Sequence, residues 1–195
     1  MIKNKFPDFY KVASLLAFLG VFFIFVFDVA ISKEINPSSL KVESSLKFDK
    51  KFSGTASVID GDSIKVADEN SKKEVRLFGL DAPEYKQICF DEKNREYACG
   101  QTSYKFLLSL INGKEVVCFY TEKDKYDRYL SKCEINHTSI NQEIVKNGMA
   151  IIYNYAESDE VMNQLESDAR KAKIGVWRGK FQKPKEYRKE HPRKN

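Results

Sequence analysis

The sequence lacks the closely spaced metal-binding residues that usually mark a zinc site. It has only two histidines, His137 and His191, and no Cys-x-x-Cys pair. Zinc sites built from cysteine and histidine normally contain such short spacings. A zinc site is therefore the weaker explanation of the cysteines, and disulfides are the alternative. The four cysteines are Cys89, Cys99, Cys118 and Cys133.

The chain also lacks an internal repeat and a strong excess of either charge. It carries 33 Lys and Arg against 28 Asp and Glu, which gives a net charge of +5. This balance is compatible with a polyanionic partner but does not indicate one. Its 195 residues, 42% of them hydrophobic, suffice for one globular domain with a core and appended segments.

The N-terminal segment has no charge from residue 12 to residue 27, after three lysines in the first eleven residues. A core helix of a soluble domain would normally show a polar face. The length lies between that of a signal-peptide core and that of a full membrane span. We expect residues 1–32 to form an export signal cleaved near Ser32, or an uncleaved helical anchor that holds the domain on the periplasmic or outer side. A buried N-terminal helix is the remaining alternative.

The rest of the chain divides into three parts by composition. Residues 33–51 are rich in Ser and Lys and indicate a linker. Residues 52–181 contain the periodic segments of a folded domain. Residues 182–195 form a basic tail with six Lys and Arg against two Glu, and we expect it to fray. It is either a solvated terminus or a nucleic-acid-binding arm.

An even number of cysteines behind an export signal favours disulfides. Four cysteines allow three pairings. We favour Cys89–Cys99, which would close a short polar loop, and Cys118–Cys133, which would join two neighbouring strands.

The periodic segments predict an α+β fold. Short β-branched runs at 52–59 and 63–67 flank Asp60-Gly61, a strong hairpin signal. Further strands are predicted at 73–78, 115–120 and 129–135. Helices are predicted at 100–112, after the N-cap Ser139, and at 158–173, and Trp177 is expected to pack on the core. This order predicts a five-stranded Greek-key barrel of the OB type with three helices.

Two stretches place acids on neighbouring turns. VIDGDSIKV holds Asp62, and RLFGLDAPE holds Asp81 and Glu84. If the first hairpin and the end of the third strand lie side by side, Asp62 and Asp81 converge, and two close carboxylates repel unless a cation neutralises them. Oxygen ligands suit a hard ion such as Ca²⁺, and Glu84 could reach a water bound to it.

Two arginines flank these acids in the sequence. Arg76 precedes the second turn, and Arg128 ends the charged loop TEKDKYDR. Arginine offers a planar fork that stays charged and suits a phosphate. Each feature alone has an ordinary explanation, because an Asp-Gly turn is usually only a turn and a lone arginine is usually a surface ion pair. Their combination indicates one acidic pocket that clamps a phosphate.

These stretches, with DKYDRYLSKC, resemble the three motifs of the thermonuclease (staphylococcal-nuclease-like) family. The resemblance extends over residues 52–181 and includes KNGMAIIYNY and the late GVW. It implies an OB-fold barrel that cleaves the phosphodiester bonds of DNA and RNA with one Ca²⁺ and leaves 3′-phosphate ends. Exported members of the family share the four-cysteine pattern, which supports the favoured disulfide pairing.

The resemblance also implies roles for particular residues. Asp62, Asp81 and the carbonyl of Ala82 match the metal ligands. Glu84 matches the residue that orients or deprotonates water, and Arg76 and Arg128 match the phosphate-binding arginines. Residues matching the nucleotide pocket are Tyr126, Tyr153 and Tyr155.

The sequence departs from the family pattern at three places. Ser63 replaces Thr and keeps the hydroxyl. Asp127 replaces Gly before the second arginine, where it tolerates unusual turn geometry but adds a negative charge. The pair Tyr153 and Tyr155 lies one residue closer to its preceding glycine than the family pattern has it.

Three functions remain open at this point. A calcium-dependent endonuclease acting on single-stranded or loosened DNA and RNA, with little sequence preference, is favoured because all five acids and arginines are present. A non-catalytic OB module that binds nucleic acid or protein is the first alternative. A membrane-tethered adhesion or assembly module using the basic tail is the second. The resemblance implies no protein partner.

Overall fold

A computed structural model describes residues 47–153 and 159–192. The described residues belong to the second of two compact units of the chain, Glu43–Asn195. The hydrophobic run at 12–27 and Tyr155 lie outside the described residues. Within the described ranges, no helix combines the length and the apolar character needed to cross a bilayer.

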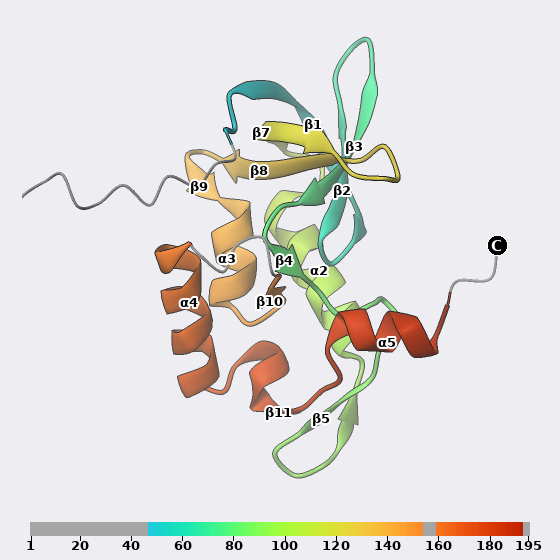
Figure 1. The fold of residues 1–195 in the computed structure, drawn as a ribbon, viewed down its shortest axis with the longest axis vertical. Helices are drawn as coiled ribbons and strands as arrows, with labels where there is room; N and C mark the ends of the chain where they lie inside the picture. The colour runs from blue at the N-terminus through green and yellow to red at the C-terminus, as the bar shows by residue number, and fades with distance from the viewer. Residues whose placement is uncertain (1–46, 154–158, 193–195) are drawn as a thin grey trace, which may run out of the picture. The chain divides into compact units, whose positions relative to one another are not determined.

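A closed barrel of five strands forms the upper part of the domain in Figure 1. The sheet order is β3-β2-β1-β7-β8, and a parallel pairing between β3 and β8 closes the ring. All the other barrel pairings are antiparallel, so the barrel is mixed. It confirms the OB-type α+β fold. The strands are β1 Lys50–Asp60, β2 Ser63–Ala67, β3 Lys72–Leu77, β7 Glu115–Lys123 and β8 Tyr129–Ile135.

Alternation along these strands points every second side chain inward, as a pleated strand requires. Ile64 and Val66 of β2 and Val75 and Leu77 of β3 are buried in one core cluster. Leu107 of helix α2 packs in the same cluster. The barrel and the helices therefore share one hydrophobic core.

Four helices accompany the barrel, at α2 Cys99–Ile111, α3 Ile140–Lys146, α4 Glu160–Lys171 and α5 Pro184–Glu190. The first three match the predicted helices. Ser139 caps α3 by accepting a hydrogen bond from the amide of Gln142. A 3-10 turn, Gly175–Arg178, carries Trp177, whose ring lies edge-on against Phe181.

Six short strands were not predicted. β4 Leu80–Asp81 pairs with β10 Ile151–Ile152, and β9 Thr138–Ser139 extends the barrel sheet beyond β8. β5 Cys89–Asp91 and β6 Glu96–Tyr97 form a hairpin that pairs with β11 Gly179–Lys180. Each has only two or three residues, too few to show a period in the sequence.

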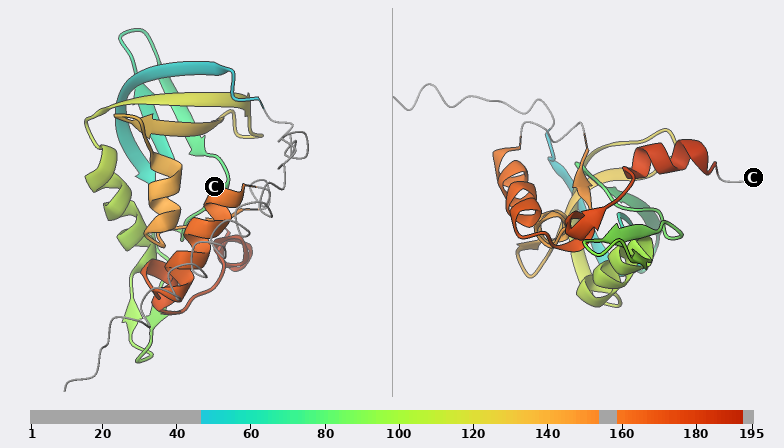
Figure 2. Two further views of the ribbon diagram at one scale, coloured as in Figure 1. Left: turned by 90° about the vertical axis from the view of Figure 1, so that its left-hand side faces the viewer. Right: turned by 90° about the horizontal axis from the view of Figure 1, so that it is seen from below.

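Helix α5 corrects the expectation that the basic tail frays. Pro184 opens the helix at a position where its missing amide hydrogen is not needed. Figures 1 and 2 place α5 on the opposite side of the molecule from α4. The prediction rested on the many charges of the tail. One of them, Arg188, pairs with the carboxylates of Asp81 and Glu84, which holds the helix on the domain.

Both favoured disulfides are present, so the zinc alternative is wrong. Cys118 and Cys133 face each other across the β7–β8 ladder and are bonded. Cys89 of β5 is bonded to Cys99 at the start of α2. No cysteine is left free.

Candidate active site

The first hairpin and the end of the third strand lie side by side, and Asp62 and Asp81 converge as expected for that arrangement. Asp62 lies in the β1–β2 turn, and Asp81 ends β4. The amide of Ala82 donates to Asp62 Oδ2 at 3.0 Å, which ties the two turns together. A Cβ on Gly61 would lie 2.8 Å from the Cβ of Ala82, so the turns can approach this closely only with glycine there. Asp62 and Asp81 are only 3% and 1% exposed.

Arg76 bridges the two aspartates from β3. One terminal nitrogen of its guanidinium pairs with Asp62 Oδ1, and the other lies 2.8 Å from Asp81 Oδ1. Burial lowers the pKa of Arg76, but the charges of Asp62 and Asp81 outweigh it and raise the pKa above its ordinary value. Arg76 is therefore a fixed cation inside the acid pocket.

Arg128 reaches the edge of this pocket through a hydroxyl. Its Nη1 donates to Ser63 Oγ at 3.4 Å, and Ser63 Oγ donates to Asp62 Oδ1 at 2.9 Å. Asp124 holds the other side of the guanidinium, with contacts of 2.9 Å from Nε and 2.6 Å from Nη2. Burial raises the pKa of Asp124, but hydrogen bonds from Arg128 and nearby amides outweigh it and lower the pKa below 3.8.

Glu84 lies on the loop that follows Asp81. The buried side chain of Gln87 holds this loop in place. The amide of Glu84 donates to Gln87 Oε1 at 3.2 Å, and the amide of Gln87 donates to the Glu84 carbonyl at 2.7 Å. Gly100 at the start of α2 lies against this loop, since a Cβ there would be 1.8 Å from the Glu84 carbonyl oxygen. The loop is therefore packed directly against a helix.

A third arginine, which the sequence did not lead us to expect, contacts these acids. Arg188 of α5 donates from Nη1 and Nη2 to the two oxygens of Asp81, at 2.9 and 3.0 Å. Its Nη1 also donates to Glu84 Oε1 at 3.0 Å. The pocket thus joins three carboxylates to two guanidiniums.

Two of the predicted tyrosines, Tyr126 and Tyr153, lie near residues of the pocket. Tyr126 is 67% exposed, and the guanidinium of Arg128 lies 5.5 Å from its ring centroid. The amide of Tyr153 donates to the carbonyl of Gly79, and Lys185 Nζ of α5 lies 5.7 Å from the Tyr153 ring.

The donor atoms suit a hard cation in their chemistry. The expected ligands are two carboxylates and one carbonyl, all oxygen donors of the kind Ca²⁺ takes. In the part of the chain that the structure describes, no group of three or more acidic, histidine or cysteine side chains is gathered to hold a metal ion. Both oxygens of Asp81 accept hydrogen bonds from Arg188, so a cation bound to Asp81 would compete with Arg188 for that carboxylate.

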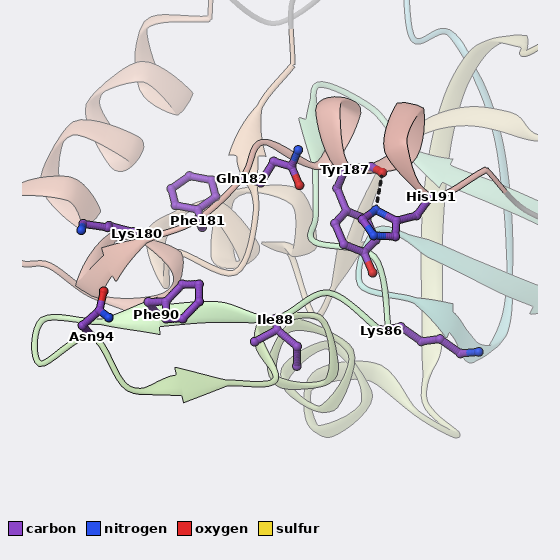
Figure 3. Close-up of a pocket in the computed structure, with 9 residues that line it drawn as sticks. All are labelled: Lys86, Ile88, Phe90, Asn94, Lys180, Phe181, Gln182, Tyr187 and His191. Carbon is purple, nitrogen blue, oxygen red and sulfur yellow. Dashed lines mark hydrogen bonds between the residues drawn. The ribbon is translucent and has the colours of Figure 1, made fainter.

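A cavity of about 640 Å³ lies between the β5–β6 hairpin and the C-terminal segment (Figure 3). Tyr187 of α5 and His191, the residue after this helix, stack on one wall, with ring centroids 4.1 Å apart. The lining residues are Lys86, Ile88, Phe90, Asn94, Lys180, Phe181, Gln182, Tyr187 and His191. None of the predicted site residues lines this cavity.

The fold is a closed OB-type barrel in which Arg76 bridges two buried aspartates, one in the first hairpin turn and one in β4. Residues 74–179, more than half of the chain, match the family described as staphylococcal nuclease homologue. The chain belongs to that family. Asp62 and Arg188 lie outside the matched residues.

The chain is similar in sequence to three bacterial proteins, two of which are named as endonucleases. It is 35% identical over 121 residues to an uncharacterized endonuclease of Escherichia coli O157:H7, covering 62% of this chain and 72% of the relative. It is 34% identical to an uncharacterized endonuclease of Haemophilus influenzae, covering 62% of each chain. The succinoglycan biosynthesis protein ExoI of Rhizobium meliloti is 30% identical, covering 64% of each.

Sequence reasoning missed Arg188, Asp124 and Gln87. Asp124 had a usable signal, since it lies four residues before Arg128 in the same charged loop. Arg188 had none, because its partners lie more than a hundred residues earlier. Gln87 is a buried amide whose role depends on the tail that packs over it.

Proposed function

We propose that this protein is an endonuclease that hydrolyses phosphodiester bonds of DNA, RNA or both with the help of Ca²⁺. The observation that carries the proposal is the buried pair Asp62 and Asp81 bridged by Arg76, in a chain of the staphylococcal nuclease family. Relatives named as endonucleases support the same class of activity.

The acidic residues have two different proposed roles, cation binding and activation of water. Asp62, Asp81 and the carbonyl of Ala82 would hold the cation, which supplies positive charge beside a phosphate oxygen when bound. The carboxylate of Glu84 orients the attacking water and accepts its proton.

The arginines act on the phosphate. Arg76 and Arg128 stabilise the charge that gathers on its equatorial oxygens as water attacks. Cleavage of the P–O5′ bond leaves a 3′-phosphate end. The fixed position of Arg76 between two buried acids supports this role, because a preorganised cation needs no rearrangement during the reaction.

The margin of the pocket suits a single-stranded or loosened substrate. The exposed ring of Tyr126 beside Arg128 provides a surface for stacking, and Tyr153 and Tyr155 are proposed to flank the nucleotide. Stacking and phosphate contacts read little sequence, so we expect slight sequence preference.

We also propose that the domain works outside the cytoplasm, either tethered by the uncleaved segment 1–32 or released after cleavage near Ser32. The two disulfides support this location, since they persist in oxidising compartments.

The deciding experiment is digestion of single-stranded DNA and RNA by the oxidised protein, with Ca²⁺ and then with EGTA. We expect cleavage that needs Ca²⁺ and falls by a factor of about 10² or more in Glu84→Gln, because the general base is lost. Glu92→Gln, on the exposed β5–β6 turn, serves as the control. Products should become substrates for 5′-labelling without prior removal of a 5′-phosphate.

Binding without cleavage would favour the alternative, a non-catalytic nucleic-acid or protein binding module. One observation favours that alternative, namely the contact of Arg188 with two of the three acids.

A further inference from the structure

The C-terminal helix places a guanidinium on two of the proposed catalytic acids. Arg188 forms a two-pronged pair with Asp81 and shares Nη1 with Glu84, at distances of 2.9 to 3.0 Å. Such bidentate pairs are among the stronger charge-assisted contacts in proteins. The side chain of Arg188 is 34% exposed, whereas that of Asp81 is 1% exposed. The arginine thus covers a buried carboxylate from the solvent side.

Charge explains why the acids accept a second arginine. Asp62, Asp81 and Glu84 carry three negative charges, and Arg76 balances one of them. Like carboxylates held together repel unless cations lie between them. Arg188 supplies a second positive charge from within the chain. Burial lowers the pKa of Arg188, but the bonds to Asp81 and Glu84 outweigh this effect and raise the pKa above its ordinary value. Arg188 therefore stays charged.

Two further contacts hold this part of the chain beside the pocket. The side chain of Gln87 accepts a hydrogen bond from the amide of Glu84 through Oε1. Its Nε2 donates to the carbonyl of Gln182 at 2.7 Å. Lys185 of α5 lies over the ring of Tyr153. The C-terminal segment from Gln182 to Arg188 therefore contacts Gln87, the two acids Asp81 and Glu84, and a tyrosine proposed to bind substrate.

We propose that Arg188 competes with a divalent cation for the active-site acids: it pairs with Asp81 and Glu84 in the cation-free protein and leaves Asp81 when the cation binds. The proposal rests on the proposed function, because it takes Asp81 as a cation ligand. A cation of the Ca²⁺ type binds carboxylate oxygens directly at about 2.3–2.6 Å. Such a cation at Asp81 would lie beside a guanidinium that donates to both of its oxygens, and the two like charges would repel each other.

This competition has a thermodynamic consequence. If only the undocked state binds the cation, the apparent affinity is reduced by the fraction of molecules in that state. Binding of the cation and release of Arg188 are then one coupled step. Because Lys185 belongs to the same short helix, undocking of that helix would also move Lys185 away from the ring of Tyr153.

The first test measures Ca²⁺ affinity by titration calorimetry on the full oxidised protein without nucleic acid. Arg188→Gln should bind Ca²⁺ about tenfold more tightly than the unaltered protein, as expected when a competing docked state is removed. Arg188→Lys keeps the charge but loses the fork, and should lie between the two. Lys189→Gln is the matched control, since Lys189 is the next residue of α5 and has no ion pair among the described residues. It should leave the affinity unchanged.

The second test needs no variant and so does not depend on folding of a mutant. Amide hydrogen exchange across α5 should be slow without Ca²⁺ and should become faster when Ca²⁺ is saturating. The proposal is overturned if Arg188→Gln binds Ca²⁺ no more tightly than the unaltered protein, or if saturating Ca²⁺ leaves exchange in α5 unchanged.

Cleavage assays separate this proposal from the proposed function. A protein that cuts DNA but fails either test loses only the assignment of Arg188. A protein that passes both tests but never cuts loses the assignment as a nuclease and keeps Arg188 as a cation-displaced residue.

Discussion

Arg128 is held in place by two partners that differ in sequence distance. Asp124 lies in the same loop and binds two of its nitrogens, while Ser63 lies across the pocket on β2. Asp127, in between, has a φ of +64°, a conformation that favours glycine and that aspartate tolerates. Its carboxylate is 83% exposed and pairs with Lys123. The replacement of glycine thus keeps the turn, and its added charge is partnered by a lysine.

Replacement of Arg128 tests the phosphate clamp at the scale of one residue. Arg128→Ala should lower the cleavage rate by a factor of about 10² or more, because a charge positioned for the transition state is lost. The measurement is the rate at saturating DNA, with binding followed separately. Arg95→Ala, which removes an exposed arginine of the β5–β6 turn that also pairs with an aspartate, is the control. Unchanged turnover in Arg128→Ala would contradict the clamp.

At the scale of the elements, the disulfide of the β5–β6 hairpin lies next to the loop that carries Glu84. Cys89–Cys99 fastens the hairpin to the first residue of α2, and the next residue, Gly100, lies against the carbonyl of Glu84. The Cys118–Cys133 bond joins β7 to β8 in the barrel wall and makes no such link. The two disulfides therefore affect different parts of the protein.

Removal of each disulfide should separate stability from activity. Cys89→Ser with Cys99→Ser should lower the free energy of unfolding by about 2–3 kcal/mol, as expected for a short closed loop, and should also slow cleavage by the folded protein. Cys118→Ser with Cys133→Ser should cost a similar free energy but leave the rate of the folded fraction nearly unchanged. Urea unfolding and cleavage rates in the absence of urea measure the two effects. Equal loss of rate in both pairs would contradict this division.

The elements also differ in how well the sequence predicts them. Strands β1, β2, β3, β7 and β8 alternate strongly or contain β-branched runs, so their positions could be predicted to within a few residues. Convergence of Asp62 and Asp81 followed from the Asp-Gly turn and the barrel order. Helix α5 could not be predicted, because its seven residues are mostly charged and its docking depends on Asp81 and Glu84. Local patterns carry no information about contacts of that range.

Three aspartates among the described residues have lowered pKa values and contribute to the response of the folded domain to acid. Hydrogen bonds from Lys73, Arg95 and Arg128 lower the pKa values of Asp68, Asp91 and Asp124 below 3.8, although burial raises that of Asp124. A lowered pKa in the folded state means that the unfolded chain binds more protons at low pH. The stabilisation is therefore complete above pH 3.8 and is lost as the pH falls through the lower, folded-state values.

Acid titration of a variant checks this assignment. Asp124→Asn should be less stable than the unaltered protein at pH 6, and the difference should shrink as the pH falls below 3.8, because the unaltered protein then loses the same interaction. Urea unfolding at pH 6, 4 and 3 measures the difference. Asp49→Asn, in the described segment before the barrel, is the control. A difference that stays constant with pH would contradict the role of Asp124.

Closure of the barrel depends on strands that are far apart in the chain. Val75 of β3 pairs with Tyr129 of β8, and Arg128 immediately precedes that strand. Contacts over such distances form late, and a chain under synthesis folds from its N-terminal side. A ribosome that has made Asp62, Arg76 and Asp81 has therefore not yet made the strand that closes the ring. The order of synthesis itself would keep the proposed nuclease inactive beside the messenger RNA from which it is being translated.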